Sequence, residues 1–270
     1  MKKIKQAFRK IEKFNWPFTT LAVLIALGLT VFFLYTEDIE DEPGSGDFDF
    51  NISTKPENNE NETNDYQDNN GGDDIMEKIK LPEPDTFGRT PLEKTIQDRR
   101  SIRSFTDEGL EREEVSQLMW SAQGITDETE ELRASPSAGA TYPLEVYYID
   151  EKGVYHYDPN EHSLELIRQG DKRSELEGAS LGQGFIGEAP ANVVIAAVFS
   201  RTQNVYGTKD GERYVHIEAG HAAQNIHLQA VSLGLGSVPV GAFDDDSVRE
   251  VLTLPDDHEP LYVIPVGHPR

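Results

Sequence analysis

The residues of this sequence best suited to chemistry begin with a cluster of cations near position 100. Arg99, Arg100, Ser101 and Arg103 place three guanidinium groups and a hydroxyl within five residues. Forked arginine donors and a serine hydroxyl suit a phosphate or another oxyanion. The same cations could instead cap the negative end of a short helix predicted over 91–100. We favour the anion site, because the cluster stands out in a strongly acidic sequence.

Two stretches of small residues could admit a flat ligand. The first is the loop that contains Pro136, Ser137, Ala138 and Gly139. The second is Gly241 and Ala242, which follow a short apolar run. Where side chains almost vanish, a planar molecule can contact backbone N–H groups directly. We therefore expect a planar ligand at these stretches.

Cysteine and histidine offer no competing chemistry. The chain has no cysteine, which excludes disulfides, thiolate catalysis and cysteine-ligated metals. His221 and His227 share one predicted helix, and we interpret them as structural. A zinc site would need further convergent ligands that the sequence does not place, so no metal site is predicted.

Helices and strands alternate along the part of the chain that must position these residues. Small and apolar residues recur every three or four positions over 215–233, which predicts a long helix ended by Gly234 and Gly236. The run 237–243 is expected to be a buried strand. Other elements are predicted over 91–100, 110–123, 144–149, 154–157, 164–166, 171–181, 192–199, 247–252 and 261–266, with 201–212 as a polar excursion. The pattern indicates a layered α+β or α/β domain of about 190 residues.

Charge limits the partners of this domain. The 270 residues carry a net charge of −24. Residues 1–80 hold 9 Lys/Arg and 16 Asp/Glu, which leaves 16 and 33, a net charge of −17, for 81–270. This argues against nucleic-acid binding through a basic surface. We interpret the acidity as a surface that favours solubility, with a cationic partner as the alternative.

The first 80 residues are predicted to anchor and tether the domain. Residues 1–13 form a basic tail, and 14–36 carry no charged side chain. A helix over 14–36 would be roughly 34 Å long, enough to cross a bilayer. We expect an uncleaved single-pass transmembrane helix, with the N-terminus cytoplasmic and the folded domain, 81–270, outside the membrane. The acidic, Asn-rich range 37–80 is expected to be a disordered linker.

Five short motifs follow one another between position 90 and the end of the chain. They are 100–105 (RSIRSF), 136–143 (PSAGATYP), 218–225 (EAGHAAQN), 240–245 (VGAFDD) and 265–269 (PVGHP). In this order they resemble the nitroreductase superfamily, most closely its SagB-type (thiazole/oxazole dehydrogenase-like) branch. The resemblance implies an α+β fold that binds FMN non-covalently, usually at a homodimer interface.

The resemblance also assigns the candidate residues to parts of the cofactor. Those expected at the phosphate and ribityl end are Arg99, Arg100, Ser101, Arg103 and Arg270. Those expected along the flavin are Pro136, Ser137, Ala138 and Gly139. Gly241 and Ala242 are expected at the reactive N5 edge, and Gln183 near the pyrimidine ring. The flavin supplies the electron chemistry, which fits the lack of an obvious catalytic dyad.

Tyr206 is the one candidate for a catalytic side chain. Azoline-oxidising members of the branch carry a Lys-Tyr pair ahead of the long helix, and this chain has Val205-Tyr206 there. Lys209 could replace the missing lysine. The departure speaks against peptide-azoline oxidation and leaves flavin binding unaffected.

The function that the resemblance implies is a membrane-anchored, FMN-dependent oxidoreductase. It would pass two electrons, as hydride, between a donor such as NAD(P)H or a quinol and a small organic substrate. One alternative is a non-catalytic flavin-binding sensor or scaffold. The other is an azoline-to-azole peptide dehydrogenase that lacks the usual lysine.

Overall fold

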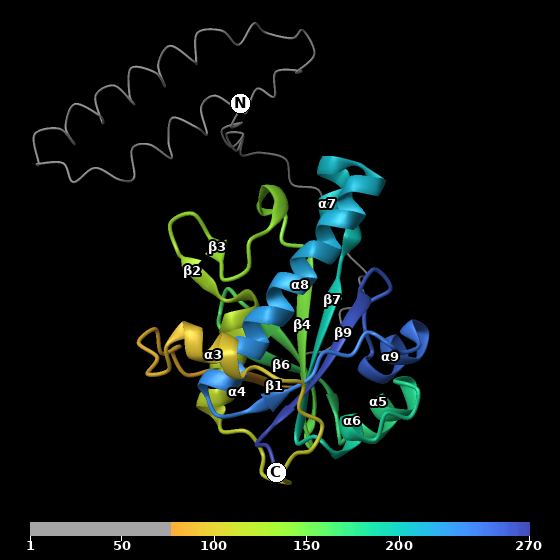
Figure 1. The fold of residues 1–270 in the computed structure, drawn as a ribbon. Helices are drawn as coiled ribbons and strands as arrows, with labels where there is room; N and C mark the ends of the chain where they lie inside the picture. Colours follow the sequence, from red (N-terminus) through yellow and green to blue (C-terminus); the bar gives the residue numbers. More distant parts are fainter. Residues whose placement is uncertain (1–76) are drawn as a thin grey trace, which may run out of the picture. The chain divides into compact units, whose positions relative to one another are not determined.

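A seven-stranded antiparallel sheet forms the centre of the folded domain (Figure 1). The computed structural model describes residues 77–270, so the predicted tail, membrane span and most of the linker lie outside it. The strand order is β1-β6-β5-β4-β7-β9-β8. The strands are β1 (Glu77–Lys80), β4 (Leu144–Ile149), β5 (Gly153–Asp158), β6 (Ser163–Gln169), β7 (Ala191–Ala197), β8 (Gly236–Ser237) and β9 (Glu259–Gly267). The predicted hairpin over 144–157 is confirmed as β4 and β5.

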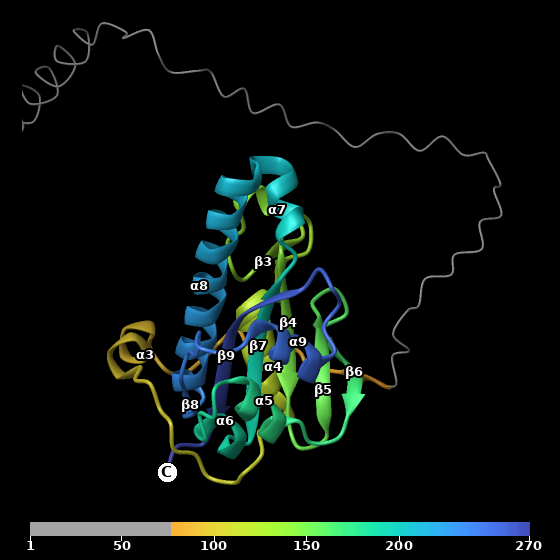
Figure 2. The same cartoon turned by 90° about the vertical axis from the view of Figure 1, so that its right-hand side faces the viewer.

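Helices pack on both faces of this sheet (Figures 1 and 2). On one face lie α4 (Arg112–Gln123) and α8 (Thr208–Ser232), with α3 (Leu92–Asp98) beside α8. On the other face lie α5 (Arg173–Ala179), α6 (Phe185–Glu188) and α9 (Asp245–Leu252). Two short strands, β2 (Ile125–Asp127) and β3 (Leu132–Arg133), form a separate hairpin. This arrangement makes the predicted α+β layered domain.

The burial of strand β7 on both faces explains why its sequence is apolar apart from Asn192. Successive side chains of a strand point to opposite faces. Val193 and Ile195 pack with the core beneath α4 and α8, whereas Val194 and Ala196 pack with the core beneath α5, α6 and α9. Because both faces are covered, the strand has no position where a polar side chain would reach water.

The predicted polar excursion over 201–212 is wrong. Residues Phe199–Tyr206 form helix α7, and α8 begins at Thr208 rather than at position 215. The two helices pack closely at Gly211, where a Cβ would lie 2.7 Å from the Cα of Gln203. The glycine that reads as a helix breaker is thus the residue that lets α7 approach α8.

The predicted strand over 237–243 is also wrong in most of its length. Only Gly236–Ser237 pair with β9, and Val240 adds an isolated bridge to Val263. Pro239 between them has no N–H to donate to a ladder. The side chains of Val238 and Val240 are nevertheless buried, each at most 5% exposed. The segment therefore reaches Gly241 and Ala242 as an irregular, packed chain.

The predicted membrane localisation needs correction. Within residues 77–270, no helix combines the length and apolar character needed to cross a bilayer. Helix α8 is long enough, at 25 residues, but Lys209, Asp210, Glu212 and Arg213 lie in its first two turns, and such charges are costly in hydrocarbon. The prediction of a single-pass membrane protein with an extracytoplasmic domain is wrong for this part of the chain. The expected span, 14–36, lies outside the described residues.

Candidate functional site

The first group of predicted residues lies where α8 ends. Ser101 forms a parallel bridge with Ser237 of β8, and the backbone N–H of Ile102 donates to the Ser237 carbonyl at 3.0 Å. The segment that carries the arginines therefore runs beside the strand that leads to Gly241. Ser101 and Gly241 are both exposed.

The three clustered arginines have different environments. Arg100 donates to the carbonyls of Gln97 and Arg99 at 2.9 and 2.7 Å, so it caps the end of α3 as the alternative interpretation predicts. Arg103 lies over the ring of Phe185, with its Cζ 5.5 Å from the ring centroid. Arg99 lies close enough to His227 to help burial lower the pKa of that imidazole to about 4. Within 77–270, neither Arg99 nor Arg103 has an ion pair, so both are available to an anion.

Gln183 links the region of the cation cluster to the backbone at Gly241 and Ala242. Its side-chain amide donates to the carbonyls of Ala242 and Ser180, both at 2.9 Å. Phe185, which contacts Arg103, follows two residues later at the start of α6. A Cβ added to Gly241 would meet no atom within 4 Å. Arg103, Gln183 and the open backbone at Gly241 thus lie in one region of the surface.

Arg270 lies next to this region but points its charge elsewhere. Its backbone N–H donates to the Ser104 carbonyl at 3.2 Å, which places the chain end along the arginine segment. Its guanidinium pairs with the exposed carboxylate of Asp107 at 2.9 Å. The predicted phosphate contact therefore requires this surface ion pair to open, at a modest cost.

The second group of predicted residues lies at the other end of α8. The loop after β3 contains a short 3-10 turn, η1 (Ala138–Ala140). The hydroxyl of Ser137 accepts from the Tyr142 N–H at 2.9 Å. The phenol of Tyr206, on α7, packs on Gly139. The structure therefore brings the candidate catalytic tyrosine to the loop of small residues.

The contact between Gly139 and Tyr206 makes Gly139→Ala a sharp test of this loop. Gly139 has φ +60°, and a Cβ there would lie 2.6 Å from the Tyr206 hydroxyl. We expect the substitution to lower the free energy of unfolding by about 2 kcal/mol, from the left-handed backbone and the contact together. Denaturant unfolding measures this loss. In a Tyr206→Phe background the loss should shrink, and an equal loss in both backgrounds would contradict the contact.

Glu218 is a buried carboxyl group beneath this loop that the sequence did not single out. It is 3% exposed, and burial raises its pKa to about 7, while the Ser137 hydroxyl and Arg133 oppose the rise. Among the described residues, its Oε1 has no hydrogen-bond partner. The signal in the sequence is its position: Glu218 lies among Val215, Ala219 and Ala222 on the buried face of the helix.

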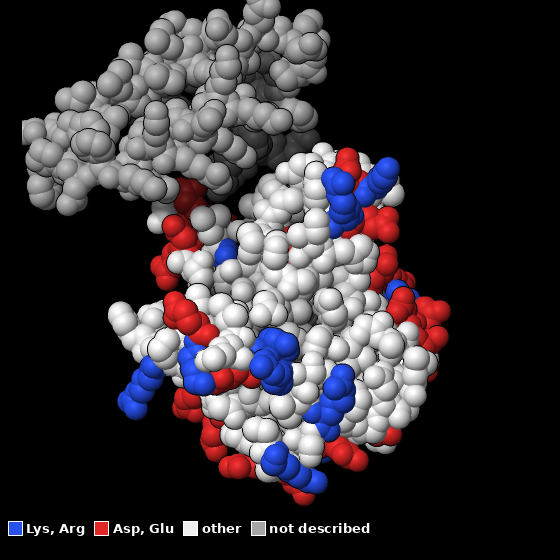
Figure 3. Space-filling view, viewed as in Figure 1, with Lys and Arg blue, Asp and Glu red and all other residues white. Residues whose placement is uncertain are grey.

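The two groups lie at opposite ends of one long helix. Figure 1 shows α7 at the start of α8, where Tyr206 contacts Gly139, and Figure 2 shows β8 beside the end of α8. At 25 residues, α8 is roughly 37 Å long. Figure 3 shows that uncharged side chains dominate the middle of the face along α8, with Lys and Arg side chains towards both ends of the helix. A single chain therefore does not bring Arg103 and Gly139 together.

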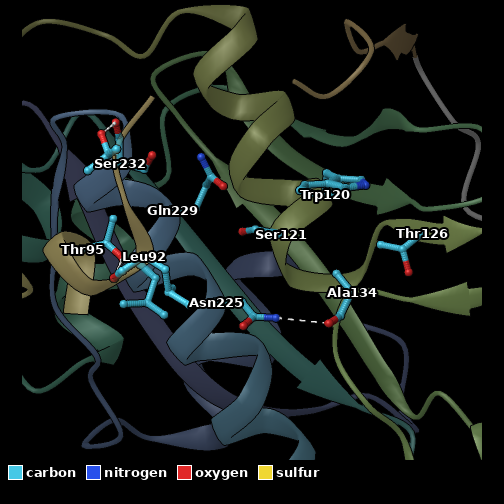
Figure 4. A pocket seen from close by; sticks show the side chains of 11 residues that line it. Leu92, Thr95, Trp120, Ser121, Thr126, Ala134, Asn225, Gln229 and Ser232 are labelled. Atoms are coloured by element: carbon cyan, nitrogen blue, oxygen red, sulfur yellow. Dashed lines mark hydrogen bonds between the residues drawn. The ribbon is translucent and has the colours of Figure 1, made fainter. Parts of the chain in front are cut away.

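A groove between α3, α4 and α8 lies outside both groups (Figure 4). Its volume is about 420 Å³, and Thr95, Trp120 and Gln229 line it from the three helices. The amide of Asn225 crosses its floor to the Ala134 carbonyl at 3.4 Å. It contains none of the predicted cofactor-binding residues.

Comparison with known proteins shows the family to which the chain belongs. Residues 96–268 match the Nitroreductase family. MJ1384 of Methanocaldococcus jannaschii, described as a nitroreductase, is 44% identical over 200 residues, covering 72% of this chain and 97% of that protein. The FMN reductase (NAD(P)H) of Bacillus subtilis is 29% identical over 189 residues, covering 65% of each chain. A Ralstonia eutropha crystal structure, also described as a nitroreductase, matches with TM-score 0.66 and 34% identity, over 74% of this chain and 92% of that one. The chain belongs to the nitroreductase family, and with it to the oxidoreductases.

Proposed function

We propose that this protein binds FMN between two copies of the chain and transfers two electrons from NAD(P)H to a small organic acceptor. The observation that carries the proposal is the pair of unpaired guanidinium groups, Arg99 and Arg103, beside the open backbone at Gly241. The name of the B. subtilis relative supports both the cofactor and the donor. A quinol donor was expected because of the predicted membrane location. Since that location is corrected above, no observation supports a quinol.

The residues at the end of α8 fit the polar parts of FMN. Arg99, Ser101 and Arg103 would hold the phosphate and ribityl chain, because the two cations have no carboxylate partner within residues 77–270 and Ser101 is exposed. Arg270 could join them once its pair with Asp107 opens. Arg100 is occupied by the end of α3 and would contribute only its charge.

The flat part of the cofactor would lie against backbone. Gly241 and Ala242 would face its reactive edge, and Gln183, held by the Ala242 carbonyl, its pyrimidine ring. Pro136, Ser137, Ala138 and Gly139 would cover it from the second copy, since one chain keeps these groups at opposite ends of α8. When bound, the flavin supplies the hydride chemistry, and the loop and Tyr206 would orient the substrate and exclude water.

The spectrum of the purified full chain tests this function. Protein reconstituted with FMN should show a flavin absorbance band that bleaches on addition of NADPH or NADH and returns when a quinone or nitroaromatic acceptor is added. Sedimentation should show a dimer. Protein that takes up no FMN would refute the proposal. Protein that binds FMN but turns over no donor would favour the sensor or scaffold alternative.

Within the family we keep the SagB-type branch as the finer proposal, on the five motifs in order. Peptide-azoline oxidation is the more distant candidate, because the position expected to hold lysine is Val205, which is 61% exposed. Lys209 begins the next helix and is exposed. If Lys209 has the family role, Lys209→Ala should abolish oxidation of an azoline peptide and leave NAD(P)H oxidation intact.

A further inference from the structure

A polar cavity next to the 135–143 loop is not used by the proposed flavin contacts. Its volume is about 270 Å³, and it lies at the ends of β4 and β5. Glu145 and His156 from these strands line it, together with Arg133 of β3 and Arg201 of α7. Its carboxylates have cationic partners, whereas one of its arginines has no carboxylate partner within residues 77–270.

Each carboxylate that lines the cavity already has a cation. Glu145 accepts from Arg201 at 2.6 Å and from His156 at 2.7 Å. Asp158 and Glu165 lie 3.4 and 2.9 Å from the ammonium group of Lys78. The negative charges of the cavity are therefore compensated within the protein.

Arg133 is the charged side chain of the cavity that has no ion pair among the described residues. Its guanidinium is half-buried, and within residues 77–270 no carboxylate lies at salt-bridge distance from it. Burial lowers its pKa, which reports an incompletely compensated charge. It lies over the Tyr142 ring at 4.6 Å and donates to the Gln123 side-chain carbonyl at 3.2 Å. A guanidinium has five N–H donors, so most of those of Arg133 remain free for a ligand.

Gln123 lines the same cavity and has a donor without an acceptor among the described residues. It ends α4, is 1% exposed and lines the cavity. Its carbonyl oxygen is used by Arg133, and its Nε2 has no acceptor among the described residues. A buried amide N–H without an acceptor destabilises a fold unless a ligand or water completes it.

We propose that this cavity binds a small organic carboxylate, held by the guanidinium of Arg133 and the amide of Gln123. The planar fork of arginine matches a carboxylate with two parallel hydrogen bonds. Leu144 and Val146 line the cavity as well and provide apolar surface for the carbon skeleton. A monoanion suits the site better than a phosphate dianion, because Arg133 is the one cation that lines the cavity without a carboxylate partner among the described residues, so a second negative charge would have no partner there.

Titration of the full chain with simple anions tests the proposal. Sodium acetate, sodium benzoate and inorganic phosphate are compared with sodium chloride at equal ionic strength, by calorimetry and thermal denaturation. The two carboxylates should bind saturably and raise the denaturation midpoint, and chloride should not. Arg133→Gln should abolish the carboxylate effect and leave any phosphate effect unchanged, since phosphate also suits the cluster of Arg99 and Arg103. Gln123→Met, which keeps the volume and removes the donor, should weaken carboxylate binding at least fivefold.

Arg112→Gln is the matched control, because Arg112 is an exposed arginine on α4. This substitution should leave carboxylate binding unchanged. If Arg133→Gln fails to fold, Gln123→Met still decides the outcome. Absence of saturable carboxylate binding would overturn the proposal. So would carboxylate binding that survives both substitutions at full strength, or phosphate binding that Arg133→Gln abolishes. None of these readouts depends on FMN.

Discussion

Replacing Arg103 by alanine is expected to weaken FMN binding about 10- to 100-fold, since a charge-assisted hydrogen bond contributes about 1.5 to 3 kcal/mol. Arg103 is exposed, lies over Phe185 and has no ion pair among the described residues, so a phosphate would be its main electrostatic partner. Adding Arg99→Ala should weaken binding further. Quenching of flavin fluorescence during titration measures the affinity.

Three comparisons separate phosphate binding from a general loss of positive charge. Arg112→Ala, at an exposed position of α4, should leave FMN affinity within about twofold. Arg103→Lys should recover part of the affinity, because lysine keeps the charge but loses the fork. Riboflavin, which lacks the phosphate, should bind Arg103→Ala and the unaltered protein equally. If Arg103→Ala weakened riboflavin binding as much as FMN binding, the arginine would act on the fold rather than on the phosphate.

Sequence periodicity predicted best the helices and strands whose apolar residues follow directly from which of their faces are buried. Strand β7 is apolar because both of its faces are covered, and α4 shows both its apolar face and its end at Gly124. Helix α7 and the start of α8 were missed because their exposed residues carry no apolar pattern and Gly211 reads as a breaker. The glycine is explained only by the approach of Gln203, a tertiary contact that periodicity cannot show.

The candidate site was predictable where the chemistry lies in consecutive residues. The arginine cluster, the small-residue loop and Gly241 could be chosen from local composition alone. Their distribution over the two ends of α8 could not, because it depends on how that helix crosses the sheet (Figure 2). The direction of Arg100 towards Gln97 and of Arg270 towards Asp107 is likewise a matter of geometry. The burial of Glu218 could be inferred from its place on the apolar face of α8, but its neighbours Ser137 and Arg133 could not, because they come from the segment that packs on the helix.

Glu218→Gln is expected to change how the stability of the protein depends on pH. The pKa of Glu218 is raised from 4.5 to about 7 in the folded protein, chiefly by burial. Below pH 4.5 the carboxyl is neutral in both states, and its contribution to stability is fully present. As pH rises through 7, the unfolded chain has lost the proton that the folded chain holds, so stability falls. The shift corresponds to at most about 3 kcal/mol.

The glutamine variant cannot ionise, so it should avoid this loss. Its free energy of unfolding relative to the unaltered protein should rise between pH 5 and pH 8, by up to about 3 kcal/mol, as measured by denaturant titration at each pH. Glu212→Gln, at an exposed position of the same helix, should show no such rise, because water surrounds that side chain in the folded and in the unfolded protein. A constant difference between Glu218→Gln and the unaltered protein across this range would mean that Glu218 is ionised in the folded state. In that case Arg133 and the Ser137 hydroxyl, the two groups that favour the charged form, would outweigh burial, and Arg133 would have less positive charge left for a ligand in the neighbouring cavity.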